Sequence, residues 1–349
     1  MKKNASPSSK QSGTKKQKNV LIILVTVAFL ILAGAVFFFL NQTGPADKSD
    51  TDAIPIQVKQ GETADQIADT LKEKGVIKNK MAFKSYLKSH NVANKLHAGS
   101  YLLSPSMTTE ELVNELLNGV GEVIKVTIPE GYILKEVAEE FEKKELMDQD
   151  TFWDLVKHYD LSDYSYMKDA PENEHRMEGI FYPETYFFEV GSTPEEVFDT
   201  IVGHFDKIWA ELPENKSGLS DYDMLILASM IEKEAKNDKE RPTIASVYLN
   251  RLERDMPMQC DATILYAMPE RKTQLHYSDY KYKSIYNTYL HRGFPPTPIC
   301  NPGVESLKAA CQPDDTDYLY YLWDRVDKDG HIFSKTYKEH LKHQEKLGY

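Results

Sequence analysis

Residues 221–236 read DYDMLILASMIEKEAK, an apolar helical pattern that ends in two glutamates. Apolar residues recur at helical spacing, which predicts one stripe that packs on the core of a domain. Ser220 and Asp223 are predicted to cap the start of this helix. The stripe consists of Met224, Leu227, Ala228, Ile231 and Ala235.

Glu232 and Glu234 stand two residues apart near the end of this predicted helix. Side chains at that spacing point about 200° apart, so the two carboxylates cannot act on one bond as a matched pair. At most one is expected to be catalytic. The alternative is that both lie on the surface and one pairs with a neighbour such as Lys236.

Residues 20–40 are 21 consecutive residues without a charge, a length that crosses a bilayer. The alternatives are a buried core helix or a cleaved signal peptide, but no small-residue cleavage site is evident after Leu40. Residues 1–19 contain six lysines and no acid. We therefore predict a cytoplasmic tail, one membrane helix and an extracytoplasmic remainder in the cell membrane.

The part of the chain beyond the membrane is predicted to be strongly acidic. When the six lysines are left out of the 42 basic residues, 36 remain against 54 acidic ones, a formal net charge of −18. Such a surface repels a nucleic-acid backbone, so nucleic acid is not expected as a partner. The three cysteines and two spaced histidines, His331 and His340, form no metal-binding pattern, and no cofactor is expected.

The remainder is predicted to fold as α+β, with a linker over 41–53 and a small module over 54–118. In this module strands are expected at 54–59 and 100–103. Helices are expected from Thr63 to about residue 74, over 80–90, and from Thr108 to 117. Gln66 and Glu111 complete capping boxes for the first and last of these.

A larger domain is expected over 123–349, after the NGVGE boundary at 118–122. It opens with a strand over 123–128, a turn at 129–131 and a helix over 134–144. Thr193 is predicted to cap a further helix, with Pro194 in its first turn.

Five motifs follow one another along the chain: MEGIFYPETY (177–186), LASMIEKEAKNDKERPTIASVYLNRLERDMPMQCDATILYA (227–267), YNTY (286–289), GFPPTPICNPG (293–303) and HIFSKTYKEH (331–340). Together they resemble the YceG-like family of endolytic murein transglycosylases. The resemblance covers nearly the whole chain. Residues 54–118 also resemble a LysM-like module, which either holds glycan or serves as a spacer.

The resemblance implies that Glu234 is the catalytic acid and base, with Glu232 as its competitor. It also implies a set of substrate contacts: Tyr182, Asn250, Arg251, Gln259, Asp261, Tyr286, Asn287 and Tyr289. Cys260 and Ala262 stand where Thr and Pro are more usual in the family, and Cys300 where a small residue is usual. We expect these departures to affect packing or cleft shape.

The activity implied is cleavage of the bond between N-acetylmuramic acid and N-acetylglucosamine in nascent peptidoglycan, leaving a 1,6-anhydro end. Membrane-embedded peptidoglycan synthases are the implied partners, since the family is associated with ending new strands. Two alternatives stay open. One is a hydrolytic muramidase that uses Asp261 as a second carboxylate, and the other is a noncatalytic wall-binding scaffold.

Overall fold

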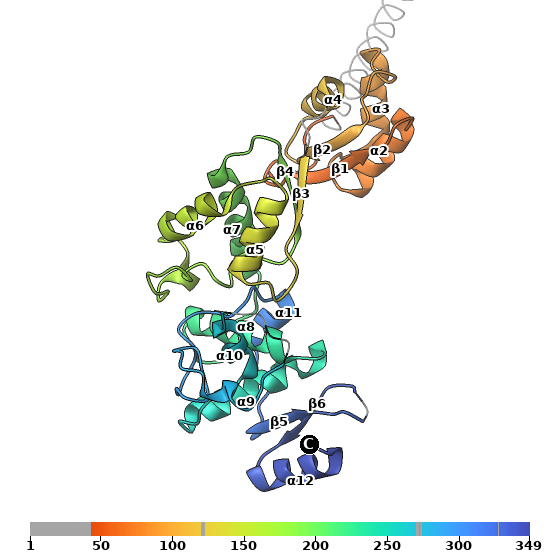
Figure 1. Ribbon diagram of the computed structural model, residues 1–349. Coiled ribbons are helices and arrows are strands. Elements are labelled where there is room, and N and C mark those ends of the chain that lie inside the picture. Colours follow the sequence, from red (N-terminus) through yellow and green to blue (C-terminus); the bar gives the residue numbers. More distant parts are fainter. Residues whose placement is uncertain (1–42, 120–122, 270–271, 273, 327) are drawn as a thin grey trace, which may run out of the picture. The chain divides into compact units, whose positions relative to one another are not determined.

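The computed structural model describes residues 43–349, apart from residues 120–122, 270–271, 273 and 327 (Figure 1). The predicted tail and membrane segment, residues 1–40, lie outside this part. Across the residues that are described, none of the helices is both long enough and apolar enough to span a bilayer. The chain divides into two compact units, residues 1–123 and 124–349.

The first unit contains one small sheet and three helices. Strand β1 (Ile54–Val58) pairs antiparallel with β2 (Gly99–Leu103), with Ile54 opposite Leu103. Helices α2 (Ala64–Glu73) and α4 (Thr109–Asn118) begin with the predicted capping boxes of Thr63 and Thr108. Helix α3 (Lys80–Ser89) lies between them in sequence, and its Phe83 and Leu87 belong to the core of this unit.

The second unit opens with an aromatic core. Strand β3 (Val123–Thr127) pairs with β4 (Thr185–Glu189), and three helices accompany them: α5 (Leu134–Lys143), α6 (Gln149–His158) and α7 (Pro194–Ala210). Phe152 packs against Phe141, Phe181 and Phe198 at centroid distances of 5.4 to 5.5 Å. These contacts join elements far apart in the sequence into one core.

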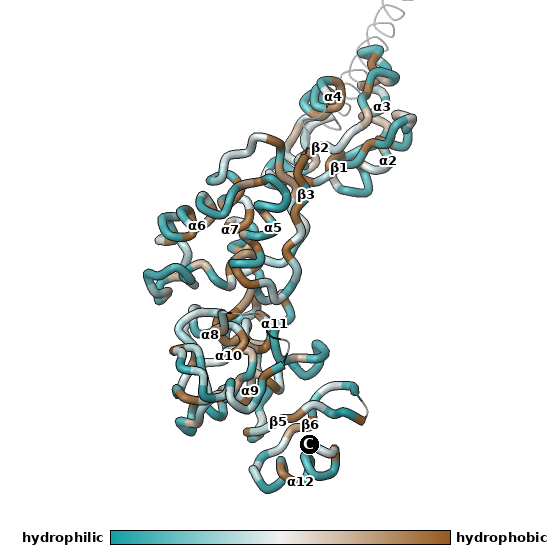
Figure 2. Tube along the Cα trace, in the orientation of Figure 1, coloured by the Kyte–Doolittle hydropathy of each residue, from teal (hydrophilic) through white to brown (hydrophobic). Residues whose placement is uncertain are grey.

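The rest of the second unit surrounds α8 (Asp221–Glu234). Helices α9 (Arg241–Glu253), α10 (Asp261–Ala267) and α11 (Val304–Cys311) all contact α8. An antiparallel hairpin of β5 (Tyr320–Trp323) and β6 (His331–Ser334) follows, and α12 (Tyr337–Leu347) packs on it. Figure 2 shows hydrophobic residues gathered around α8, and the predicted α+β class is confirmed.

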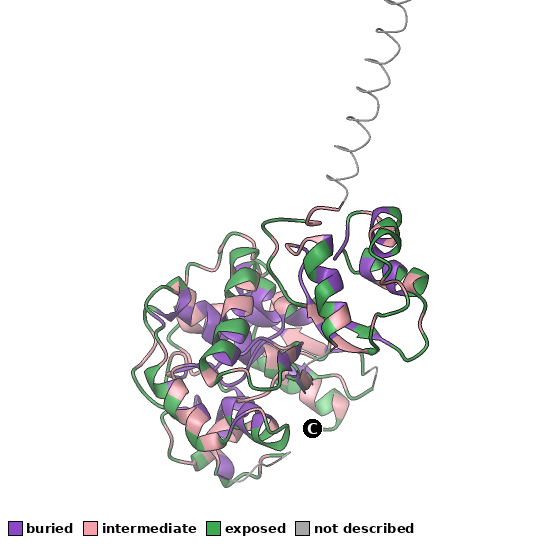
Figure 3. Cartoon of the chain, turned by 90° about the horizontal axis from the view of Figure 1, so that it is seen from above, coloured by how far each residue is buried: buried purple, intermediate pink, exposed green. Residues whose placement is uncertain are grey.

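The predicted apolar stripe on α8 packs on the core, since Met224, Leu227 and Ile231 are 0 to 2% exposed, but it is not the only buried face of the helix. Leu225, Ile226 and Met230 lie outside the stripe and are 0 to 2% exposed. Since several elements pack around α8, it is a central helix and not a surface one. Figure 3 shows buried residues along the inward faces of the helices.

The helix is also two residues shorter than predicted. It ends at Glu234, and Ala235 has extended backbone angles with φ −62° and ψ 137°. Glu234 therefore lies at the point where the chain leaves the central helix.

Candidate active site

The last turn of α8 directs Glu232 toward α11 and α9. One oxygen, Oε2, accepts hydrogen bonds from the Gly303 backbone N–H at 3.0 Å and the Ser306 hydroxyl at 2.8 Å. It also lies 3.2 Å from the Arg241 guanidinium, and the Glu232 side chain is only 7% exposed. Gly303 is the N-cap of α11, where backbone donors have no helical partner and a negative charge is favourable. Glu232 thus stabilises the start of α11.

Glu234 has a different set of partners. Its Oε1 accepts from the Cys260 thiol at 3.3 Å, and its Oε2 accepts from the Tyr321 hydroxyl at 3.2 Å. The Tyr321 hydroxyl in turn lies 2.7 Å from that of Tyr248 on α9. Among the described residues, Glu234 makes no ion pair. Its carboxyl is therefore held by two uncharged donors, from the loop before α10 and from β5.

Burial raises the pKa of Glu234 above the ordinary value of a glutamate. The charge of Asp261 acts in the same direction, whereas the hydrogen bonds from Cys260 and Tyr321 favour the ionised form and oppose the rise. Burial also raises the pKa of Cys260 and Tyr321 well above their usual values, so both stay uncharged donors. A carboxyl in such a setting can hold a proton at a higher pH than an exposed one.

Asp261 stands at the first position of α10, close enough for its charge to act on Glu234. Its Oδ1 accepts from the Tyr289 hydroxyl at 2.6 Å, and its Oδ2 from the Tyr280 hydroxyl at 3.3 Å. Gln259 is exposed two residues before, in the left-handed backbone region with φ 53°. Of the eight residues implied as substrate contacts, Asp261 lies near Glu234, Tyr289 donates to Asp261, and Gln259 precedes Cys260 in the chain.

Two others, Arg251 and Asn250, are tied into the scaffold. Arg251 is buried and donates to the backbone carbonyls of Leu319 at 2.7 Å and Met258 at 2.9 Å, and to Gln259 Oε1 at 3.2 Å. The Asn250 amide donates to the carbonyl of Thr316 at 2.7 Å. Both side chains therefore fix the strand and loop that carry Tyr321 and Cys260.

The remaining three residues are also buried. Asn287 is fully buried and donates to the carbonyls of Tyr280 and Tyr282 at 3.1 and 2.8 Å. Tyr286 is 7% exposed and shares a hydrogen bond of 2.9 Å with Thr297. Tyr182 is 9% exposed and its ring packs against that of Phe205 in the core. The structure does not bring these three side chains to Glu234.

Sequence reasoning missed a second buried carboxyl, Glu178, which is 1% exposed. It accepts from the Leu134 backbone N–H at 3.0 Å and from the Tyr266 hydroxyl at 2.8 Å. The same hydroxyl lies 3.0 Å from His175 Nδ1. Burial raises the pKa of Glu178 to about 8. Glu178 belongs to the MEGIFYPETY motif at 177–186, and its place in that motif is the one sequence signal that could have marked it as a functional residue.

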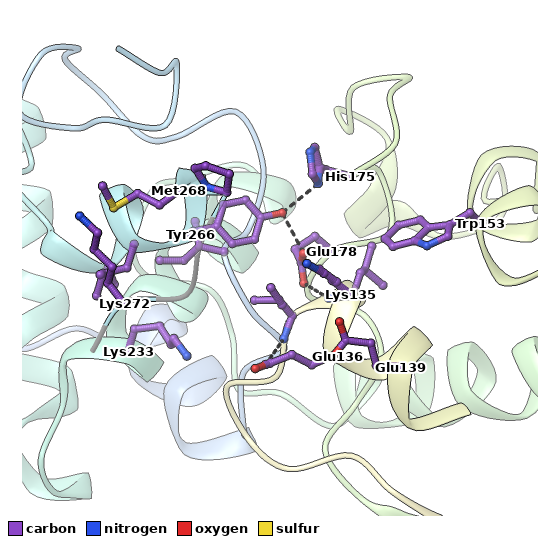
Figure 4. Close-up of a pocket in the computed structure, with 16 residues that line it drawn as sticks. Lys135, Glu136, Glu139, Trp153, His175, Glu178, Lys233, Tyr266, Met268 and Lys272 are labelled. Atoms are coloured by element: carbon purple, nitrogen blue, oxygen red, sulfur yellow. Dashed lines mark hydrogen bonds between the residues drawn. The ribbon is translucent and has the colours of Figure 1, made fainter. Parts of the chain in front are cut away.

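Glu178 borders a cavity of about 710 Å³ (Figure 4). Glu234 is not among the described residues that line it, but Lys233 and Ala262 are, and they adjoin Glu234 and Asp261 in sequence. Within the described part of the chain, no three His, Cys, Asp or Glu side chains are grouped so that they could hold a metal ion.

The YceG-like family model matches residues 56–346, so the chain belongs to the YceG-like family. It is 33% identical over 343 residues to the endolytic murein transglycosylase of Bacillus subtilis (strain 168), covering 91% of each chain. It is 29% identical to a protein of the same name from Streptococcus pneumoniae (strain ATCC BAA-255 / R6), covering 87% of this chain but 61% of that relative.

A solved structure resembles this chain as well. The crystal structure of a putative YceG-like protein from Listeria monocytogenes matches with a TM-score of 0.54 and 34% identity. The match covers 83% of this chain and 98% of that one.

Proposed function

We propose that this protein is an endolytic lytic transglycosylase of nascent peptidoglycan. It cleaves the β-1,4 bond between N-acetylmuramic acid and N-acetylglucosamine and leaves 1,6-anhydro-N-acetylmuramic acid ends. Membership of the YceG-like family and the names of its relatives support the reaction class. The observation that carries the proposal is the half-buried Glu234 carboxyl, held by two uncharged donors at the end of α8.

Glu234 acts first as general acid and then as general base. A raised pKa keeps a proton available for the leaving glycosidic oxygen, and general acid catalysis is worth about 10²- to 10⁴-fold in rate. The ionised carboxylate then accepts the proton of the muramyl 6-hydroxyl, which attacks C1 of the same sugar. Because this nucleophile is tethered to its electrophile, no second catalytic carboxylate is required.

The surroundings of Glu232 support assigning this role to Glu234. Glu232 Oε2 is already engaged by Arg241, Gly303 and Ser306. A side chain held by these three partners is fixed to the scaffold between α8 and α11. Glu232 would also have to leave the start of α11 to reach a substrate.

A hydrolytic muramidase is the second candidate, and the position of Asp261 favours it. Its charge acts on Glu234, so the two carboxyl groups lie near each other, as a hydrolase requires. Both Asp261 oxygens accept hydrogen bonds from tyrosine hydroxyls, which fits a fixed carboxylate better than a mobile base. We therefore assign Asp261 to substrate contact, together with Gln259 and Tyr289.

The remaining features fit the same role at the cell membrane. Residues 20–40 form the single membrane anchor, with the N-terminus in the cytoplasm and the catalytic domain outside. The LysM-like module over 54–118 aids capture of the strand. By cutting nascent strands the enzyme ends their elongation, and membrane-embedded synthases are its partners.

Product masses test the proposal. Purified peptidoglycan is digested with the protein, and the released fragments are analysed by mass spectrometry. Anhydro ends, lighter than reducing ends by one water, are the expected result. Reducing ends would establish the muramidase instead, and the absence of any cleavage would favour the noncatalytic scaffold.

A further inference from the structure

The cavity beside Glu178 has the size and lining of a ligand site. Its volume of about 710 Å³ falls within the range of about 300 to 1,000 Å³ that is usual for such sites. Trp153, Leu134 and Tyr266 contribute apolar surface, and Lys135 and Lys233 contribute amines. Figure 4 shows Tyr266 directed at His175 and Glu178, with the Trp153 ring at the margin of the group.

The cavity adjoins the proposed catalytic glutamate through two elements. On α8, Lys233 lines the cavity and the next residue is Glu234. On α10, Ala262 lines it and the preceding residue is Asp261. Adjacent Cα atoms are about 3.8 Å apart, and adjacent helical side chains point about 100° apart. The cavity lining and the proposed catalytic carboxyl therefore stand on neighbouring residues of both α8 and α10.

The residues that line the cavity include lysines and glutamates, together with two titratable groups that are buried or half-buried. Lys233 donates to the Gly131 backbone carbonyl at 2.9 Å, a contact that leaves its charge unneutralised, and Lys135 is exposed. Glu136 and Glu139 line the cavity from the same helix as Lys135. At the wall, burial raises the pKa of Glu178 and lowers that of His175, so both are mainly neutral near pH 7.

We propose that this cavity receives the short peptide branch of the muramyl sugar bound at Glu234, a peptide with small apolar side chains, carboxylates and an amine. The apolar wall takes the small side chains, the lysines pair with the carboxylates, and the glutamates pair with the amine. A bare glycan offers hydroxyls and acetamides but no ions for these groups. The inference rests on the proposed function and extends it to reading of the peptide.

The test compares two substrates with the full-length chain. Peptide-bearing glycan strands and the same strands stripped of peptides by an amidase are digested, and kcat/KM for cleavage is measured. We expect the wild type to cleave stripped strands about tenfold less efficiently, the order of one charge-assisted contact. Equal efficiency on both substrates would overturn the proposal.

Lys135→Glu is the informative variant. Position 135 is in the first turn of α5, where an acidic residue suits the helix dipole, so the fold is expected to persist. We expect an about tenfold loss of kcat/KM on peptide-bearing strands and no change on stripped ones. Lys216→Glu reverses an exposed lysine that does not line the cavity and is expected to match the wild type on both substrates.

The outcomes separate this inference from the function on which it rests. If Lys135→Glu lowers cleavage of both substrates equally, the cavity does not read the peptide, although the transglycosylase activity stands. If the wild type releases no anhydro ends from either substrate, the proposed function itself fails. Thermal melting curves verify that both variants are folded.

Discussion

Glu232 and Glu234 share one helical turn, yet their surroundings are opposite. Glu232 lies beside the Arg241 guanidinium and the N-terminus of α11, and both favour a negative charge. Glu234 lies between a thiol and a phenol, with Asp261 nearby and no ion pair among the described residues. The contrast shows that the neighbours of a carboxyl, more than its place in a motif, determine whether it supports the fold or holds a proton.

The Glu232 region is packed too tightly for a movable acid. Gly303, which donates to Glu232, lies against the Glu130 carboxylate, which would have to move if residue 303 carried a Cβ. Burial and the nearby charge of Glu232 raise the pKa of Glu130. Two carboxyls and one arginine thus meet at the start of α11, which is an arrangement suited to holding helices together.

The largest expected effect is that of Glu234→Gln. This substitution keeps the shape of the side chain and removes the transferable proton, so kcat is expected to fall by about 10²-fold or more. The melting temperature and binding of glycan strands are expected to persist. Near wild-type turnover in the folded variant would contradict the assignment of Glu234.

Glu232→Gln is expected to affect stability and to leave catalysis largely intact. It removes the charge that pairs with the largely buried Arg241, at a cost of about 1 to 3 kcal/mol in the free energy of unfolding. Urea titration measures this change, and kcat is compared per folded molecule. A stable but inactive Glu232→Gln protein would reverse the roles of the two glutamates.

Tyr321→Phe sharpens the comparison, because it removes one of the two donors to Glu234. A hydrogen bond to a carboxylate favours ionisation, so its loss is expected to raise the pKa of Glu234 further. The alkaline limb of kcat/KM then moves to higher pH, and the maximal rate falls about two- to tenfold. Tyr320→Phe, next along β5, is the control. An unchanged or acid-shifted limb in Tyr321→Phe would contradict the described contact.

A separate effect, on stability, concerns Glu178, which stands more than 50 residues before Glu232 in the sequence. Its pKa is about 8 in the folded chain and about 4.5 as a free side chain. Between these values the folded state keeps a proton that the unfolded state releases, so stability falls as pH rises. The loss approaches about 1.4 kcal/mol per pH unit in this window.

Glu178→Gln is expected to flatten this decline, since the amide does not titrate. Melting temperatures of the wild type and the variant between pH 5 and pH 8, a window of about three units, measure the difference. Parallel pH profiles of the two proteins would show that Glu178 is ionised in the native state.

Local features of the fold could be predicted from the sequence because the residues that interact in them are only a few positions apart. The capping boxes of Thr63 and Thr108 each join residues three apart, and both are present. The all-round burial of α8 could not be predicted, because it depends on helices contributed from later in the chain. Periodicity detects the most apolar side of a helix but not how many neighbours cover it.

The candidate site, like the fold, could be predicted only where the residues involved are close together in the sequence. The E-K-E segment identified two candidate glutamates, but the choice of the catalytic one depends on the residues that contact each of them. Cys260 is 26 residues from Glu234 and Tyr321 is 87 residues from it. Arg251 has a side chain typical of substrate binding, yet it donates to backbone carbonyls of the scaffold, a role that no short pattern reveals.

The most direct test of the contrast between the two glutamates is infrared titration of the Glu234 carboxyl. The carbonyl stretch of protonated carboxyls is recorded as pH is raised, and the spectrum of Glu234→Gln is subtracted from that of the wild type. The account predicts a protonated carboxyl in the difference spectrum that persists above the ordinary pKa of about 4.5. A signal that is lost at or below that pH would contradict it.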